Sequence, residues 1–595
     1  MPSRPRRKLI AAGIALVIVL VLAYLWRPLG IVRGPFMLLY KYPAMVTGPL
    51  LAAVIFGGLH YAIDATSRRV KSARGRTKST RAPTRWSRFR RYSDWNPYNW
   101  TPSHPLAGPA LSAAYAGALV CLVFAIFSSA LTQRAIAQNT AYGKLDVATL
   151  QGGEVRIKPY EVAMNQLQNS LSSPTERVSN MHVVNVDNRL SWTAARDPAG
   201  FFRTFTKQTA GIITSDAETS SPGVKVHGPG RDADFKYGPG MQVSDNIRWV
   251  LYKKCFTCDV AEMVSIATPR GPVIMVPYIK YKGGPFVKRP TFGGVYLVDP
   301  DGRIDDLSPE RARANPMVRN SGRMFPEGLA RRTAGSYKYI LGITNRMFTR
   351  KEAYEIADSD TENSQPYLQK FANLPHAAWV TTMTPRGRAG STGMVMLMDA
   401  VTGETRIWKA PQNASYISNV KALDIVRGER LGVNFAGAFR AIEPRQVFPG
   451  GRLHFLVSVV PQQANRSTLN VIVDAEKQTV VKVFPATPQG DRDVIAYLND
   501  KPVSGEYDFT GGQPGDLPEQ EEDADAGQSS DDDAPTPPSD DAPTGNDEVS
   551  TIQRLLERNR RQQDDLDLQE RDLQRILEEA QAENAAESDE ETGER

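Results

Sequence analysis

Residues 68–91 read RRVKSARGRTKSTRAPTRWSRFRR, and this stretch decides the organisation of the chain because it lies between two apolar segments. It contains no Asp or Glu and eleven basic residues: Arg68, Arg69, Lys71, Arg74, Arg76, Lys78, Arg81, Arg85, Arg88, Arg90 and Arg91. Short loops with such an excess of positive charge stay on the cytoplasmic side of a bilayer. The stretch therefore predicts a cytoplasmic loop, residues 64–105, that lies on anionic lipid headgroups.

Three charge-free apolar segments surround this loop, at about residues 9–26, 42–63 and 106–131. Roughly 20 apolar residues are enough to cross a hydrocarbon core of ~30 Å. The first segment could instead be a signal peptide, but its apolar core is longer than the usual ~7–15 residues. We predict an integral plasma membrane protein with a membrane region at 1–134, a cytoplasmic N-terminus and an extracytoplasmic region at 135–595.

Nucleic-acid binding is the alternative interpretation of the basic loop, because Arg and interleaved aromatic residues can contact phosphates and stack on bases. Trp86 and Phe89 lie within the stretch, and more aromatic residues follow it. A topology determinant on anionic lipid explains the charge, the position and the aromatic residues together. We therefore favour the bilayer as the partner of this loop.

Charge divides the chain into three parts. Residues 1–134 carry 19 basic and 2 acidic groups, residues 135–510 carry 46 and 36, and residues 511–595 carry 7 and 27. The middle part is long enough for two or more domains with their own cores. Its predicted divisions, and those of the tail, are a first ectodomain part at 135–270, repeated units at 271–510, a disordered acidic linker at 511–548, a helix or weak coiled coil at 549–586 and an acidic tail at 587–595.

The external region contains a Cys-Phe-Thr-Cys pair, Cys255 and Cys258. An oxidising compartment permits a disulfide there. A redox pair usually lies at the start of a helix, whereas residues 248–252 are expected to form a strand before the pair, with a short helix possible after it. A metal site would need further ligands, and no second Cys pair or His cluster supplies them. We predict a structural disulfide and no metal or cofactor.

A pattern of an apolar strand, an Asp and a polar turn recurs at 293–304, 393–408 and 469–483. An Asp carboxylate can accept hydrogen bonds from amides of the turn, and Gly tolerates positive φ there. The turn residues are Asp299 and Gly302, Asp399 and Gly403, and Asp474, which is followed by Glu-Lys-Gln instead of a Gly.

Each copy has an apolar lead-in strand, at 273–279, 376–383 and 453–460, so that each unit is predicted to be a meander of three antiparallel strands. Residues 181–192 begin a degenerate fourth unit. Helical patterns occur at 160–171, 309–314 and 350–358. The predicted fold class is α+β, because a helix laid across an antiparallel sheet buries one of its faces.

The closing Val-Asp-x-x-x-Gly type of turn resembles the PepSY and cystatin-like group of small extracytoplasmic domains. The resemblance rests on Val298-Asp299-Pro-Asp-Gly302, Met398-Asp399-Ala-Val-Thr-Gly403 and Val473-Asp474-Ala475. It implies a row of binding or regulatory modules rather than an enzyme. Consistent with this, the chain has neither a Gly-x-x-x-x-Gly-Lys phosphate loop nor a His-Glu-x-x-His zinc helix.

The expected function is that of a non-catalytic, membrane-anchored envelope scaffold or accessory protein that binds other envelope or membrane proteins. The alternative is a membrane-anchored sensor or enzyme regulator that binds a ligand in its PepSY-like modules. Leu566, Leu573 and other apolar residues at heptad spacing in 549–586 predict weak self-association, docking to a partner, or a single charged helix. Nucleic acid is not an expected partner.

Overall fold

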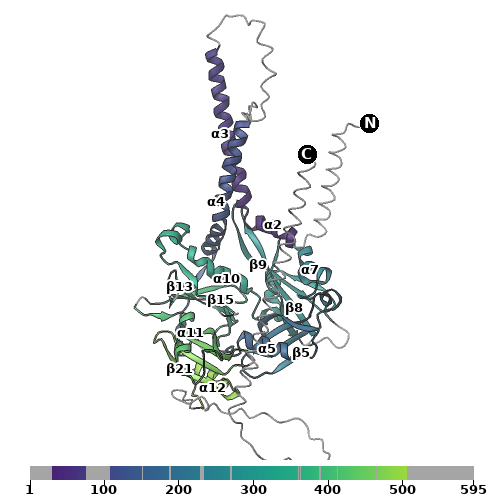
Figure 1. Ribbon diagram of the computed structural model, residues 1–595, viewed down its shortest axis with the longest axis vertical. Helices are drawn as coiled ribbons and strands as arrows, with labels where there is room; N and C mark the ends of the chain where they lie inside the picture. Colours follow the sequence, from purple (N-terminus) through teal and green to yellow (C-terminus); the bar gives the residue numbers. More distant parts are fainter. Residues whose placement is uncertain are drawn as a thin grey trace, which may run out of the picture. The chain divides into compact units, whose positions relative to one another are not determined.

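The computed structural model describes residues 30–75, 107–150, 152–186, 189–227, 234–268, 271–359, 361, 363–387, 390–411, 413–463 and 466–505. All of them belong to one compact unit, residues 1–517. They form an α+β fold of helices and several sheets, as predicted (Figure 1). The predicted first span, most of the basic loop, the acidic linker, the 549–586 helix and the tail lie outside the described residues.

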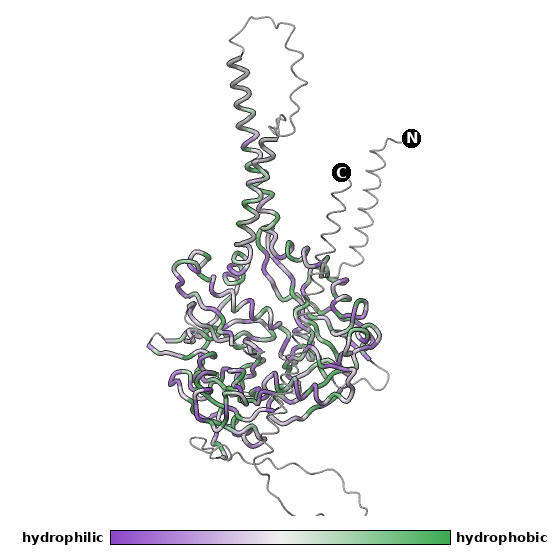
Figure 2. The backbone as a smooth tube through the Cα atoms, in the orientation of Figure 1, coloured by the Kyte–Doolittle hydropathy of each residue, from purple (hydrophilic) through white to green (hydrophobic). Residues whose placement is uncertain are grey.

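In the described residues three helices precede the sheets: α2 (Gly30–Lys41), α3 (Ala44–Gly75) and α4 (Ala107–Asn139). Helices α3 and α4 pack along each other, and hydrophobic residues line this pair (Figures 1 and 2). In the described part of the chain one segment, Ala44–Ala62 in α3, is long and apolar enough to cross a membrane. Length and composition therefore support one of the three predicted spans; the third segment is helical, in α4, but is not a candidate span by the same criteria in the described residues.

Four antiparallel meanders follow α4, one for each predicted repeat and one for the degenerate unit at 181–192. The first sheet has the order β2-β3-β4-β5, the second contains β8, β9 and β10, and the last has the order β18-β19-β20-β21. Their bounds are β2 Glu176–Val186, β3 Arg189–Pro198, β4 Ile212–Asp216, β5 Val224–His227, β6 Asp259–Val260, β7 Val264–Thr268, β8 Gly271–Gly283, β9 Lys288–Val298, β10 Ile304–Leu307, β18 Phe439–Val447, β19 His454–Pro461, β20 Leu469–Asp474 and β21 Thr479–Pro485.

The remaining meander belongs to a six-stranded sheet with the order β1-β16-β15-β13-β11, in which β12 also pairs with β13. Strand β1 follows α4 directly and pairs with β16 in parallel. The segment after α4 therefore belongs to the sheet of the second repeat. The bounds are β1 Tyr142–Lys144, β11 Tyr354–Ile356, β12 Tyr367–Gln369, β13 Ala378–Pro385, β15 Met394–Asp399 and β16 Thr405–Lys409; β14 (Ser391–Thr392) and β17 (Tyr416–Ile417) form a separate pair.

The prediction of a helix over 350–358 is wrong, because β11 occupies this segment and pairs with β13. Arg350 and Glu352 have φ angles of 55° and 53°, and such left-handed residues interrupt a right-handed helix. The other two predicted helices are present as α5 (Tyr160–Asn169) and α8 (Pro309–Ala314). In α8 the Ser308 hydroxyl caps the first turn and Pro309 occupies the first helical position.

The other helices are α6 Arg203–Thr206, α7 Ile247–Lys254, α9 Pro316–Asn320, α10 Glu327–Ser336, α11 Asn419–Gly428 and α12 Pro488–Leu498, with short turns η2 Val147–Thr149, η3 Val243–Asp245, η4 Tyr337–Tyr339, η5 Asn345–Thr349 and η6 Pro449–Gly451. The largest core packs α11 between the six-stranded sheet and the β18–β21 sheet. A second core joins the six-stranded sheet to β2–β4 through residues of α5 and α10. The repeats therefore share cores instead of forming a row of independent modules.

Candidate functional site

A cavity of about 830 Å³ lies where α2, the end of α4, β8–β9 and α10 meet, and we call it the junction pocket. Five basic side chains line it, and no Asp or Glu is among the described residues that do so. The basic residues are Arg33, Lys41, Arg331, Arg332 and Lys338. The apolar part of the lining includes Met37, Leu38 and Ile136. The pocket thus combines a positive and an apolar surface.

The positive residues of α10 and η4 come from one helical stripe. Arg331 and Arg332 are adjacent, and each lies three or four residues from Gly328 and from Gly335; Lys338 lies three residues beyond Gly335, and all five residues line the pocket. The two glycines leave room for a ligand, because a Cβ at Gly328 would meet nothing within 4 Å and one at Gly335 would meet only a side-chain methyl group at 3.8 Å. This spacing is a signal in the sequence that the sequence analysis missed.

Helix α2 is held against β6 and β8 by a charged cluster around Asp259. The Asp259 carboxylate pairs with Arg33 at 3.1 Å and with Lys41 at 2.5 Å, and it accepts a hydrogen bond from the Tyr281 hydroxyl. Burial alone would raise the pKa of Asp259, but the hydrogen bonds from Lys41, Tyr281 and Arg33 outweigh it and lower that pKa. The carboxylate is therefore ionised at neutral pH and fixes the orientation of both cations.

On the α10 side three cations have two carboxylates within ion-pair distance in the described residues. Arg331 pairs with Asp358 at 2.7 Å, and Lys338 lies 3.7 Å from Glu355. Arg332 donates a 3.2 Å hydrogen bond to the Tyr281 hydroxyl and has no carboxylate within ion-pair distance in the described part of the chain. Burial lowers the pKa of Lys338, and the nearby Glu355 offsets only part of that effect. Five cations therefore line the pocket, and three carboxylates pair with them. The remaining excess of positive charge favours an anionic ligand.

The predicted cysteine pair lies next to α2, the helix that forms one side of this pocket. Cys255 and Cys258 form a disulfide in the structure, directly after α7. The Cys258 carbonyl accepts a 2.6 Å hydrogen bond from Arg33, and the Phe256 ring packs on Phe36 of α2 with centroids 4.8 Å apart. The disulfide loop thus contacts the helix that forms one side of the pocket.

Two local predictions around the disulfide are wrong. Residues 248–252 belong to α7, not to a strand, because the Asn246 side chain caps the amides of Arg248 and Trp249 and starts a helix. The segment after Cys258 is the strand β6, not a helix, because it pairs with β8. The pair therefore follows a helix C-terminus, where the dipole does not favour a thiolate.

The predicted turn residues lie in three separate hairpins and do not line the pocket. The Asp299 carboxylate accepts from the Arg303 amide, and Asp399 and Asp474 each accept from two amides of their turns. Gly302 and Gly403 have φ angles of 83° and 77°. Of the predicted lipid-contacting basic residues, Arg68, Arg69, Lys71 and Arg74 lie in α3, while Arg76, Lys78, Arg81, Arg85, Arg88, Arg90 and Arg91 lie outside the described residues.

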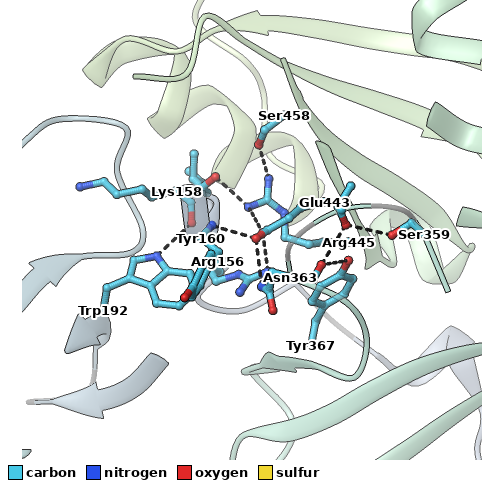
Figure 3. A network of polar contacts seen from close by, with 12 residues as sticks. Arg156, Lys158, Tyr160, Trp192, Ser359, Asn363, Tyr367, Glu443, Arg445 and Ser458 are labelled. Carbon is cyan, nitrogen blue, oxygen red and sulfur yellow. Dashed lines mark hydrogen bonds and ion pairs between the residues drawn. The ribbon is translucent and has the colours of Figure 1, made fainter. Parts of the chain in front are cut away.

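A second polar cluster lies in the interior of the sheet region, around Glu443 (Figure 3). Its carboxylate accepts from Arg156 at 2.7 Å, from the Tyr160 amide at 2.8 Å and from Asn363 at 2.9 Å. Arg445 lies 3.8 Å from the same carboxylate and donates to Ser458. All three charged side chains of the group are buried, so Glu443 compensates two guanidinium groups in the interior.

Glu443 reaches this position through an irregular backbone. Strand β18 has a bulge between Ile442 and Arg445, and Glu443 has a φ angle of 46°. A bulge turns a side chain away from the normal alternation of a strand. No pattern in the sequence predicted this cluster.

A cavity of about 200 Å³ extends from Arg156 and Trp192 to Arg323 and Trp379. At its far end His182, Glu262 and Glu327 form the one group of three potential metal ligands in the described residues. Arg323 donates hydrogen bonds to both carboxylates, and burial, together with Arg323, lowers the pKa of His182. Because Arg323 already compensates the carboxylates, this group is better explained as a buried ion-pair cluster than as a metal site.

A comparison of the chain with family models, with curated proteins and with solved structures gives no significant match. The resemblance of the hairpin turns to PepSY and cystatin-like domains thus stays an interpretation of the sequence.

Proposed function

We propose that this protein is a non-catalytic, membrane-anchored envelope protein whose ectodomain captures an anionic amphiphile in the junction pocket. The proposal follows the sensor or regulator alternative of the sequence analysis, with the ligand site moved from the repeated modules to the junction with α2 and α4. It includes the three predicted spans, a cytoplasmic loop at 64–105 and an extracytoplasmic ectodomain. Helix Ala44–Ala62 supports the membrane location.

The single observation that carries the proposal is the lining of the junction pocket. Five basic side chains and no described acidic one line a cavity that also contains Met37, Leu38 and Ile136. Basic pockets between helices at a membrane surface bind phosphate-bearing lipid headgroups. An anionic headgroup would contact Arg332 and Lys338, while a lipid chain would pack on the apolar residues.

Position along the helices agrees with this ligand. Ser129, Thr132, Gln133 and Ile136 of α4 line the pocket; the first three lie at the end of the charge-free segment 107–133, and Ile136 lies just beyond it. Helix α2 ends at Lys41, three residues before the candidate span begins. The pocket therefore borders the predicted outer membrane surface, where headgroup phosphates are found.

The experiment uses the full chain in mild detergent. Phosphatidylglycerol binding is measured by native mass spectrometry for the wild type, for Arg332→Gln with Lys338→Gln, and for the control Arg313→Gln, an exposed basic residue on α8. With about 1 kcal/mol for each basic residue near an anionic lipid, the double variant should bind about 30-fold more weakly. Equal affinity of all three proteins would refute capture in this pocket.

The scaffold function has a separate observation in its favour. Phe201, Phe202 and Phe205 are exposed, and the Phe201 ring packs on those of Phe202 and Phe205, with centroids 5.5 Å and 5.3 Å apart. Exposed aromatic clusters of this kind mark protein interaction sites. Phe202→Ser with Phe205→Ser should remove proteins that co-purify with the wild type in mild detergent, and an unchanged set would exclude this surface as the docking site.

A further inference from the structure

The tip of the β8–β9 hairpin, residues 283–287 with the sequence GGPFV, contacts the helix that contains the candidate membrane span. The Thr47 hydroxyl donates a 2.8 Å hydrogen bond to the Pro285 carbonyl. Thr47 is the fourth residue of the segment Ala44–Ala62. The hairpin rises beside the base of α3 and α4 (Figure 1). If Ala44–Ala62 crosses a bilayer, this tip must lie at the same depth as the first turn of the span.

The composition of the tip suits the boundary between headgroups and acyl chains. Phe286 has 41 % of its surface exposed although it is a large apolar residue. Residues 280–291 contain no Asp or Glu, while Lys280, Lys282, Lys288 and Arg289 flank the tip. An aromatic residue surrounded by cations is the pattern of segments that lie in the interface of an anionic membrane.

A second segment with the same character follows η4. Residues 341–351 contain three exposed apolar side chains, Leu341, Met347 and Phe348, the last with 77 % of its surface exposed. Arg346, Arg350 and Lys351 lie among them without any acidic residue. Its position is fixed near the membrane helices, because η4 packs against α4 and η5 packs against η4.

We infer that the β8–β9 tip and residues 341–351 insert Phe286 and Phe348 into the outer interface of an anionic bilayer, as two lipid contacts beside the α3–α4 pair. A bilayer explains why both segments expose apolar residues, why both are basic, and why both lie next to these helices. The inference rests on the proposed membrane location of α3 and is independent of what the junction pocket holds. It describes a lipid-facing surface on the ectodomain, distinct from the cytoplasmic basic loop.

The test places a nitroxide label at each tip of the full chain in nanodiscs that contain phosphatidylglycerol. The variants are Phe286→Cys and Phe348→Cys in a Cys121→Ala background, and labelling without reductant keeps the Cys255–Cys258 disulfide closed. Lys482→Cys, on an exposed position of β21, is the water-exposed control. Val54→Cys, on an exposed position of the candidate span, is the lipid-exposed control.

Labels at 286 and 348 should relax more strongly with oxygen than with a water-soluble nickel complex, as at 54, with a ratio severalfold above that at 482. The inference is overturned if either tip label behaves like the label at 482. It is also overturned if either is shielded from both reagents, which would show contact with protein. If the label at 54 relaxes with the two reagents in the same ratio as the label at 482, the membrane location itself is refuted. The outcome does not depend on lipid capture in the junction pocket, so the two proposals fail separately.

Discussion

Arg33 of α2 donates a 2.6 Å hydrogen bond to the carbonyl oxygen of Cys258, which lies 225 residues further along the chain. The same guanidinium pairs with Asp259 at 3.1 Å and lies over the ring of Tyr252. A helix that precedes the candidate span is thus fixed to the loop that the disulfide closes. This contact places the disulfide loop directly against one side of the junction pocket.

Opening the disulfide should loosen α2. In Cys255→Ser the Cys258 carbonyl and Phe256 lose the constraint that positions them against Arg33 and Phe36, so α2 should open more often. Hydrogen–deuterium exchange of residues 30–41 in detergent should be faster than in the wild type. Cys121→Ser is the control and should leave this exchange unchanged. Identical exchange in Cys255→Ser would show that the loop does not hold α2.

Removal of the buried charge of Glu443 should destabilise the folded sheet region strongly. Glu443→Gln keeps a hydrogen-bond acceptor but leaves Arg156 and Arg445 without a compensating charge, and breaking a buried pair in this way costs about 3–5 kcal/mol. Glu404→Gln breaks the exposed pair with Arg406 and should cost less than about 1 kcal/mol. Denaturant unfolding in detergent measures both, and equal losses would contradict a structural role for the Glu443 cluster.

Lys158 should make stability depend on pH above neutrality. Burial lowers its pKa to about 8, from an ordinary value of 10.5. Between these values the unfolded chain binds more protons than the folded one, so the free energy of unfolding rises with pH there. Below pH 8 the buried charge costs on the order of 3 kcal/mol.

The comparison that isolates this effect is with Lys158→Met. Other groups titrate in both proteins, so only the difference in their free energies of unfolding reports on Lys158. The wild type should gain stability relative to the variant from pH 8 to pH 10. A difference that stays constant over this range would show that the Lys158 pKa is not lowered.

Membrane topology is predicted from the basic loop. A protease added outside spheroplasts should digest the ectodomain and leave residues 64–105 intact, because loops with this charge remain cytoplasmic. Antibodies against residues 135–505 and against the loop would distinguish the products. Cleavage within 64–105 in intact spheroplasts would reverse the orientation.

Much of the local structure could be predicted from the sequence. The meanders follow from apolar alternation that ends at Asp299, Asp399 and Asp474, and each Asp carboxylate bonds amides only two to four residues away. Helix α8 follows from Ser308 and Pro309 at its start. These interactions lie within a few residues, so the sequence alone determined them.

The tertiary structure decided the rest. Within residues 350–358 the segment Tyr354–Ile356 forms a strand that pairs with β13, although the pattern of the whole stretch was helical. Glu443 turns inward at a bulge and pairs with Arg156, 287 residues away. The stripe from Gly328 to Lys338 forms one wall of a pocket because α2 and α4 pack opposite it. Local pattern fixes which residues are apolar, charged or able to turn. Which of them meet is decided by packing between distant segments, because buried charges and strand edges are satisfied only by the partners that the whole fold brings to them.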